Sequence, residues 1–154
     1  MSDASVSTGH SDDVAKQTTR HATCVAAHGN GVLITGASGS GKSSLALALM
    51  AYGAQLVADD GVILQAIENR IMASAPAAID GLIEARGIGI LRANTVQDAP
   101  IKLVIDMNQI EQDRLPPFRY TMVKGQSVPL LYKVDTLHFP AAVMQYLACG
   151  RQGE

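Results

Sequence analysis

The segment GASGSGKS, residues 36–43, has the residue types and spacing of a phosphate-binding loop. It matches the pattern G-x-x-x-x-G-K-[ST], and it lies between the apolar run GVLIT and a helical pattern, which is the context that this motif requires. Its glycines let successive backbone N–H groups turn towards one anion, and a helix beginning near Lys42 adds its positive end. The expected chemistry is phosphate binding, in which Lys42 reaches the terminal phosphates and Ser43 holds Mg²⁺.

This loop predicts a nucleotide site without identifying the class of enzyme. The residues expected to contact the nucleotide are Gly36, Ala37, Ser38, Gly39, Ser40, Gly41, Lys42, Ser43 and Ser44. A glycine-rich connector that matches the motif by accident is the competing interpretation, and the strand before it and the helix after it disfavour that reading. The loop alone does not distinguish an ATPase, a GTPase, a small-molecule kinase or a protein kinase.

Two adjacent carboxylates, Asp59 and Asp60, follow the apolar run LVA. Neighbouring side chains on an extended chain point to opposite faces, so one carboxylate could reach the metal while the other orients a partner. A carboxylate near a metal and a phosphate could also act as a general base towards a hydroxyl group. The competing interpretation is an acidic D-D-G turn that ends the strand.

Glu84 and Arg86 lie in the segment IEARGIGIL, beside two glycines. Glu84 could complete the shell of a Mg²⁺ ion, and Arg86 could stabilise charge on a transferring phosphoryl group. Taken alone, a Glu and an Arg two residues apart are more often part of a solvated surface, and a lone histidine such as His21 is usually structural. Only their combination with the phosphate loop indicates a role for these residues in catalysis.

Short apolar runs separated by turn residues predict the elements that position these side chains. The predicted strands are ATCVAAH, GVLIT, QLVAD and IKLVIDM, the predicted hairpins are VILQAIENRIMASA and RYTMVKGQSVPLLYKV, and the predicted helices are residues 43–52 and FPAAVMQYLA. Residues 79–91 are predicted to form a short helix or turn that leads into a glycine-rich strand. This order predicts an α/β fold with a mixed sheet.

Composition narrows the class of protein further. The 154 residues suit one domain, which we expect to span residues 20–150 behind a disordered tail at residues 1–19. A net charge of −2, a pI near 6.0 and the absence of Trp argue against nucleic acid as a partner. No apolar run is long enough to span a membrane, and the polar start lacks the apolar core of a secretory signal, so a cytoplasmic location is expected.

Taken together, these segments resemble the catalytic domain of HPr kinase/phosphorylase, the bacterial enzyme that phosphorylates a serine of the phosphocarrier HPr. The matching stretches are His21, GVLITGASGSGKS, LVADDGV and IEARGIGIL. The resemblance implies a P-loop fold related to the nucleotide-binding part of phosphoenolpyruvate carboxykinase, with a mixed sheet, hairpins and few helices. It also implies ATP and Mg²⁺ as cofactors and an HPr-like carrier of a phosphotransferase system as the partner.

The resemblance also implies a role for each site residue. The expected catalytic residues are His21, Lys42, Asp59, Asp60, Arg86 and Arg114, and the expected metal ligands are Ser43, Asp60 and Glu84. Asp60 would accept the proton of the substrate serine, with His21 interacting with the acidic pair. Arg114, in the segment DRLP, would stabilise the transferring phosphoryl group.

Two departures from the family pattern limit what the resemblance implies. Full-length members carry a large N-terminal domain, and they carry a basic C-terminal loop tied to dephosphorylation; neither is recognisable here. Kinase activity is therefore implied more directly than phosphorylase activity. Whether this chain forms the hexamer of the family stays an open question. Short forms of this kind resemble those of alphaproteobacteria. The alternatives are a small-molecule kinase or NTPase, and a nucleotide-sensing module without transfer activity.

Overall fold

The computed structural model describes residues 17–154. In chain order its elements are β1 (Gln17–Arg20), β2 (Thr23–Ala27), β3 (Asn30–Thr35), α2 (Lys42–Ala51), β4 (Gln55–Ala58), β5 (Val62–Ile67), β6 (Arg70–Ser74), the 3₁₀ turn η1 (Ala77–Ile79), β7 (Leu82–Ala85), β8 (Gly89–Arg92), β9 (Ala99–Ile110), β10 (Arg119–Val123), β11 (Gln126–Lys133) and α3 (Phe139–Cys149). The predicted strands and helices are confirmed to within a few residues at their ends.

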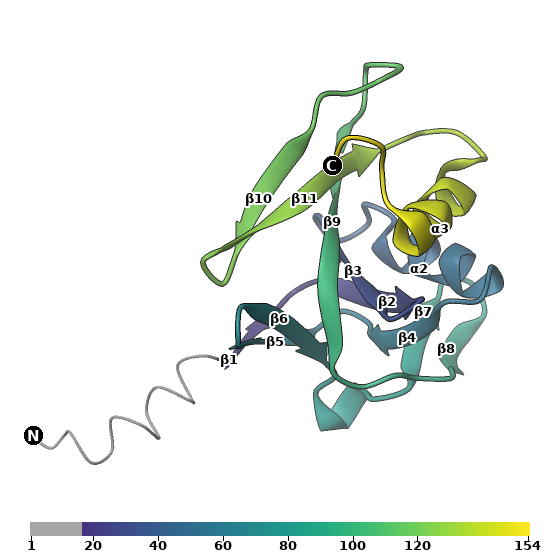
Figure 1. The fold of residues 1–154 in the computed structure, drawn as a ribbon. Coiled ribbons are helices and arrows are strands. Elements are labelled where there is room, and N and C mark those ends of the chain that lie inside the picture. Colours follow the sequence, from purple (N-terminus) through teal and green to yellow (C-terminus); the bar gives the residue numbers. More distant parts are fainter. Residues whose placement is uncertain (1–16) are drawn as a thin grey trace, which may run out of the picture.

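One long strand, β9, organises the main sheet. The sheet runs β1-β5-β6-β9-β3-β2-β4, and β11 pairs with β9 as well as with β10 (Figure 1). β9 lies parallel to β3 and to β11 but antiparallel to β6, whereas β7 and β8 form a separate hairpin. The predicted α/β class with a mixed sheet, hairpins and few helices is confirmed.

Three hairpins, two of which were predicted, turn through two-residue loops. Both residues of each loop, at 28–29, 68–69 and 124–125, have a positive φ. Such backbone angles match the twist of the flanking strands and are favoured by Gly and Asn. Pro129 precedes the point where β11 begins to pair with β9 at Leu130.

Two segments differ from the prediction. Residues 17–19, assigned to the tail, form β1 together with Arg20, antiparallel to β5; the other tail residues lie outside the described range. All four β1 side chains are exposed, so an edge strand held by backbone hydrogen bonds carried no apolar pattern to detect. Residues 82–92 form a hairpin, in which Leu82–Ala85 is a strand that was not predicted.

The core consists of two apolar clusters on opposite faces of the sheet. Leu103 and Ile105 of β9 join the cluster beneath α2 and α3, whereas Val104 joins the cluster formed mainly by the hairpins. This alternation follows from the period of two in a strand. Both helices therefore cover the same face (Figure 1), and the beginning of α2 is held against the end of β3.

The two cysteines have different environments. Cys24 is fully buried in β2, and burial raises the pKa of its thiol well above the usual range. Cys149 is exposed at the end of α3. Within residues 17–154, neither the length nor the apolarity of any helix is enough for it to cross a lipid bilayer.

Candidate active site

The phosphate loop connects the end of β3 to the start of α2. Its glycines adopt backbone angles that favour glycine, with φ of 144° at Gly36, 83° at Gly39 and 101° at Gly41. A Cβ atom at Gly36 would lie 2.6 Å from Ser40 Oγ and 3.1 Å from Met107 Cβ. Glycine at position 36 is thus required both by backbone geometry and by the close approach of the loop to β9.

The start of α2 is suited to an anion. Gly41 caps the helix without a side-chain hydrogen bond, and the first turn carries no acidic residue. Ser40 Oγ is buried and has no hydrogen-bond partner among the described residues. Backbone N–H groups at a helix start and a polar atom without a partner form the kind of cradle that a phosphate fills.

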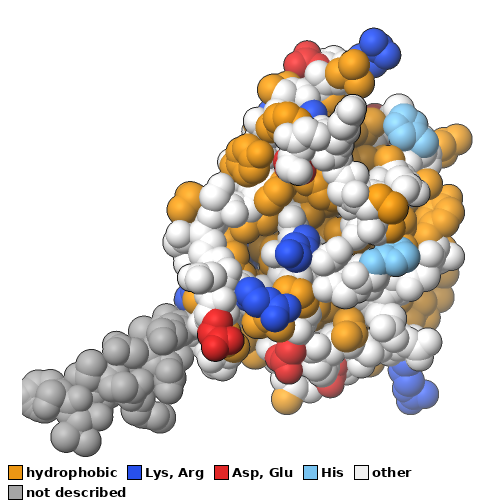
Figure 2. All heavy atoms as spheres, in the orientation of Figure 1, with side chains coloured by type: hydrophobic (Ala, Val, Ile, Leu, Met, Phe, Trp, Pro, Cys, Tyr) orange, Lys and Arg blue, Asp and Glu red, His pale blue; other side chains and the backbone are white. Residues whose placement is uncertain are grey.

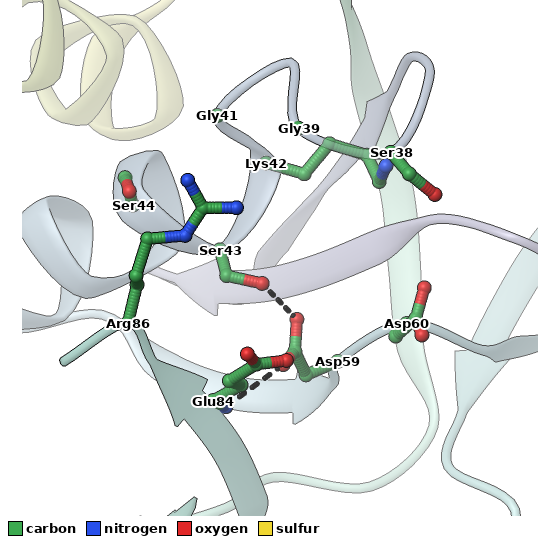
Figure 3. A pocket seen from close by; sticks show the side chains of 10 residues that line it. All are labelled: Ser38, Gly39, Gly41, Lys42, Ser43, Ser44, Asp59, Asp60, Glu84 and Arg86. Carbon is green, nitrogen blue, oxygen red and sulfur yellow. Dashed lines mark hydrogen bonds between the residues drawn. The ribbon is translucent and has the colours of Figure 1, made fainter. Parts of the chain in front are cut away.

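Lys42 is held inside this loop. Its side chain is almost fully buried, and Nζ donates hydrogen bonds to Gly36 O at 2.9 Å and to Ala37 O at 3.1 Å. Figure 3 shows the side chain lying along the loop towards Ser38. The ammonium group is therefore positioned by backbone carbonyl groups at the place where the phosphate charge is expected.

Asp59 lies at the base of the pocket and is only 7% exposed. Its Oδ1 atom accepts hydrogen bonds from Ser43 Oγ at 2.7 Å and from Thr23 Oγ1 at 2.9 Å, and its Oδ2 atom accepts one from Glu84 N at 3.1 Å. Three donors satisfy this buried carboxylate and fix its orientation towards Ser43 (Figure 3).

Asp60 follows directly but turns outwards. Its φ of 59° is in the left-handed region, and its side chain points away from that of Asp59 (Figure 3). His21 Nδ1 lies 3.0 Å from Asp60 Oδ1, and the two side chains are 56% and 67% exposed. The adjacent carboxylates are thus separated into a buried one beside Ser43 and an accessible one beside His21.

The β7–β8 hairpin forms the wall opposite the loop. Glu84 and Arg86 both line the pocket, and Figure 3 shows the Arg86 guanidinium reaching towards the start of α2. The pocket has a volume of about 320 Å³. Its lining comprises Ser38, Gly39, Gly41, Lys42, Ser43, Ser44, Asp59, Asp60, Glu84 and Arg86.

Most predicted site residues therefore meet in one place. Gly36, Ala37 and Ser40 belong to the loop without lining the pocket, and His21 contacts it through Asp60. Arg114 is the exception, because it lies exposed in the segment between β9 and β10 and does not line the pocket. The predicted role of Arg114 stays a prediction.

Sequence reasoning missed two sets of supporting residues. Thr23 is fully buried, and its Oγ1 atom also accepts a hydrogen bond from Asp60 N at 3.4 Å. On β9, Asn108 Oδ1 accepts a hydrogen bond from Ala37 N at 2.9 Å, and Asp106 Oδ1 accepts one from Asn108 N at 2.9 Å. The run DMN, which follows an apolar strand, could have indicated the residues on β9. An isolated Thr such as Thr23 gives no such indication.

The site lies within the part of the chain that matches a known family. A model of the HPr Serine kinase C-terminal domain matches residues 12–140, which include every predicted site residue. The chain belongs to this family. An HPr kinase/phosphorylase of Caldicellulosiruptor bescii is 36% identical over 152 residues, covering 93% of this chain and 48% of that protein. One from Clostridium tetani is 44% identical over 80 residues, covering 52% and 26%.

A solved structure supports the same assignment. The HPr(Ser) kinase/phosphatase from Coxiella burnetii is similar with a TM-score of 0.70 and 29% sequence identity, covering 83% of this chain and 92% of that one. The family resemblance inferred from the motifs is thus confirmed. The chain spans about half the length, or less, of the curated HPr kinase relatives it matches.

Proposed function

We propose that this chain is an ATP- and Mg²⁺-dependent serine protein kinase that acts on an HPr-like phosphocarrier protein of a phosphotransferase system. The observation that carries the proposal is the difference in surroundings between the two adjacent carboxylates. Asp59 is buried and bonded to Ser43 of the phosphate loop, whereas Asp60 is accessible and paired with His21. Family membership supports the same reaction.

The residues of the pocket fit both a nucleotide and a magnesium ion. The uncapped start of α2 and the glycine loop suit the phosphates. No group of three or more His, Cys, Asp or Glu side chains forms a ready-made metal site in residues 17–154, and Mg²⁺ characteristically combines one or two carboxylates with phosphate oxygens and water. Bound MgATP would supply the transferable phosphoryl group and a divalent charge.

We assign the role of metal-binding carboxylate to Asp59. The family resemblance had implied Asp60 for this role. Ser43 is the hydroxyl residue of the loop, and its bond to Asp59 Oδ1 brings together the two oxygen donors that P-loop enzymes use for Mg²⁺. Glu84 lies beside them in the pocket wall and is the further candidate. The side chain of Asp60 points away from that of Asp59 (Figure 3), so the proposal does not include Asp60 as a metal ligand.

Asp60 is the proposed general base. Its exposed carboxylate can accept the proton of a serine hydroxyl that a partner protein presents at the mouth of the pocket, and His21 orients it. Lys42 and Arg86 stabilise the charge on the transferring group from opposite sides. An open base of this kind favours a macromolecular substrate over a small molecule that the site would have to enclose.

A transfer assay tests the proposal. The purified chain is incubated with ATP labelled on the γ-phosphate, Mg²⁺ and a purified HPr-like carrier, with a carrier in which the target Ser is replaced by Ala as control. Label on the Ser carrier alone is the expected result. Release of labelled phosphate without carrier labelling would indicate an NTPase, and ATP binding without any transfer would indicate a sensing module; either result contradicts the proposal.

The same assay tests the phosphorylase activity that the resemblance implies. Inorganic phosphate is added to the labelled carrier after ATP has been removed, and the label that remains on the carrier is followed with time. Phosphate-dependent loss of label identifies the reverse reaction. Retention of label would restrict the function to the kinase direction.

A further inference from the structure

A second hollow lies where the sheet divides. β6 pairs with β9 only at Met72–Pro100 and Ala73–Ala99, and β11 joins the same edge of β9 from Val104 onwards. Between these points the two hairpins separate and leave a pocket of about 350 Å³. Figure 2 shows this face with a hollow that has an apolar floor and basic side chains over this floor and at its lower edge.

Two cations, one from each of the strands that separate here, line the hollow. Arg70 lies at the start of β6 and Lys102 lies on β9, and both residues line the hollow. Two like charges that line the same hollow repel each other. Neither residue forms a salt bridge with another residue of the range 17–154, and no Asp or Glu lines the hollow.

The other lining residues suit a small organic ligand. Asn69, Gln126 and Ser127 provide neutral hydrogen-bonding groups, whereas Ile71 and Val128 contribute apolar surface. The volume is at the lower end of the range for small-molecule sites, which is about 300–1,000 Å³. An anionic group would relieve the repulsion between the two cations, and an apolar portion would contact the floor.

We propose that this hollow between β6, β9 and β11 is a second binding site, for a small organic anion that carries a phosphate or carboxylate group. It shares no lining residue with the phosphate-loop pocket. Arg70 and Lys102 bind the anionic group, and the side chains between the two hairpins contact the rest of the ligand. The site stands on its own, whether or not the transfer reaction proposed above is correct.

Titration followed by amide NMR tests this site. The probe is phenyl phosphate, with benzoate as the carboxylate arm and benzyl alcohol as the neutral arm, and the full chain carries Lys42→Ala to weaken phosphate binding at the loop. We expect saturable shifts of the amides of Lys102 and Ser127 with phenyl phosphate, with benzoate, or with both. Benzyl alcohol should give none.

Charge-matched variants decide whether Arg70 and Lys102 are responsible for binding of the probe. The Arg70→Gln/Lys102→Gln double variant should bind the probe at least about tenfold more weakly, because each charged hydrogen bond is lost. The control is Arg92→Gln/Lys133→Gln, which removes one Arg and one Lys outside the hollow and should leave the affinity unchanged. The proposal would be overturned if both double variants bound the probe equally weakly, or if only amides of the phosphate loop shifted. Binding of an acidic peptide without binding of the small probes would also overturn it.

Discussion

Asp59 and Asp60 are neighbours in the chain, yet their side chains have opposite surroundings. Asp59 is buried and accepts hydrogen bonds from two hydroxyl groups and one backbone N–H group. Asp60 is exposed, adopts a φ of 59° and contacts His21. A carboxylate that is fixed on three sides suits the holding of a metal, whereas an accessible one suits proton transfer to a partner.

Substituting each aspartate by Asn separates these roles. Asp60→Asn should lower the rate of transfer by about 10²–10⁴ while nucleotide binding is retained, because only the proposed general base is removed. Asp59→Asn should instead weaken Mg²⁺-dependent nucleotide binding, which calorimetry with a non-hydrolysable ATP analogue measures. Loss of nucleotide binding in Asp60→Asn would contradict the assignment.

Thr23 is a positioning residue for both carboxylates. Its hydroxyl donates to Asp59 and accepts from the Asp60 backbone. Thr23→Val keeps the shape of the side chain but removes these bonds, so we expect kcat to fall about tenfold or more, because a hydrogen bond to a charged group contributes about 1.5–3 kcal/mol.

The conservative variant distinguishes positioning from simple stability. Thr23→Ser keeps the hydroxyl and should restore most of kcat, although it loses a buried methyl group. Steady-state kinetics at saturating ATP, with thermal melts run in parallel, provide the measurement. If Val and Ser variants lose activity equally, the hydroxyl has no positioning role.

At the scale of elements, the phosphate loop depends on the strand beside it. Asn108 at the end of β9 binds the Ala37 N–H group, and Met107 lies against Gly36. β3 and β9 are parallel and in register from Val32 to Thr35, so the loop leaves β3 beside this part of β9. The loop is therefore shaped by a segment about 70 residues further along the chain.

Gly36→Ala tests this dependence. The added Cβ would lie 2.6 Å from Ser40 Oγ at a φ of 144°, so we expect a loss of about 1–3 kcal/mol in stability and at least tenfold weaker nucleotide binding. Gly29→Ala is the matched control, because Gly29 also has a positive φ but no atom within 4 Å of the added Cβ. Unfolding and nucleotide titration are measured for both, and normal nucleotide binding by Gly36→Ala would refute the argument.

At the scale of the whole molecule, β9 connects the two clusters of the core. Its side chains alternate between the helix-covered face and the hairpin face, and three other strands pair with it. The strand thus joins the packing of both faces to the phosphate loop. A loss of packing on β9 should destabilise the whole fold.

Leu103→Ala should lower the free energy of unfolding by about 2–5 kcal/mol, because this fully buried side chain would leave a cavity. Ile110→Ala, on the same strand but 51% exposed, should change it by no more than about 0.5 kcal/mol. Urea unfolding followed by far-ultraviolet circular dichroism provides both values. Similar values for the two variants would show that burial on β9 does not control stability.

Local patterns were sufficient to predict much of this molecule. Gly-rich spacing followed by a helical pattern located the phosphate loop, and apolar runs separated by turn residues located the β5–β6 and β10–β11 hairpins. These features depend on backbone preferences of a few neighbouring residues. The edge strand β1 escaped prediction because its side chains are all polar and exposed, so the strand has no apolar pattern.

The sequence by itself thus determined the phosphate loop, the acidic pair, the Glu84–Arg86 segment and the α/β class. Only the tertiary structure decided which aspartate faces Ser43, because that depends on Thr23 and on the β7 backbone, both distant in sequence. It also decided that Arg70 and Lys102 line one hollow where the sheet divides. Such contacts arise from strand pairing across long stretches of chain, which local residue patterns do not record.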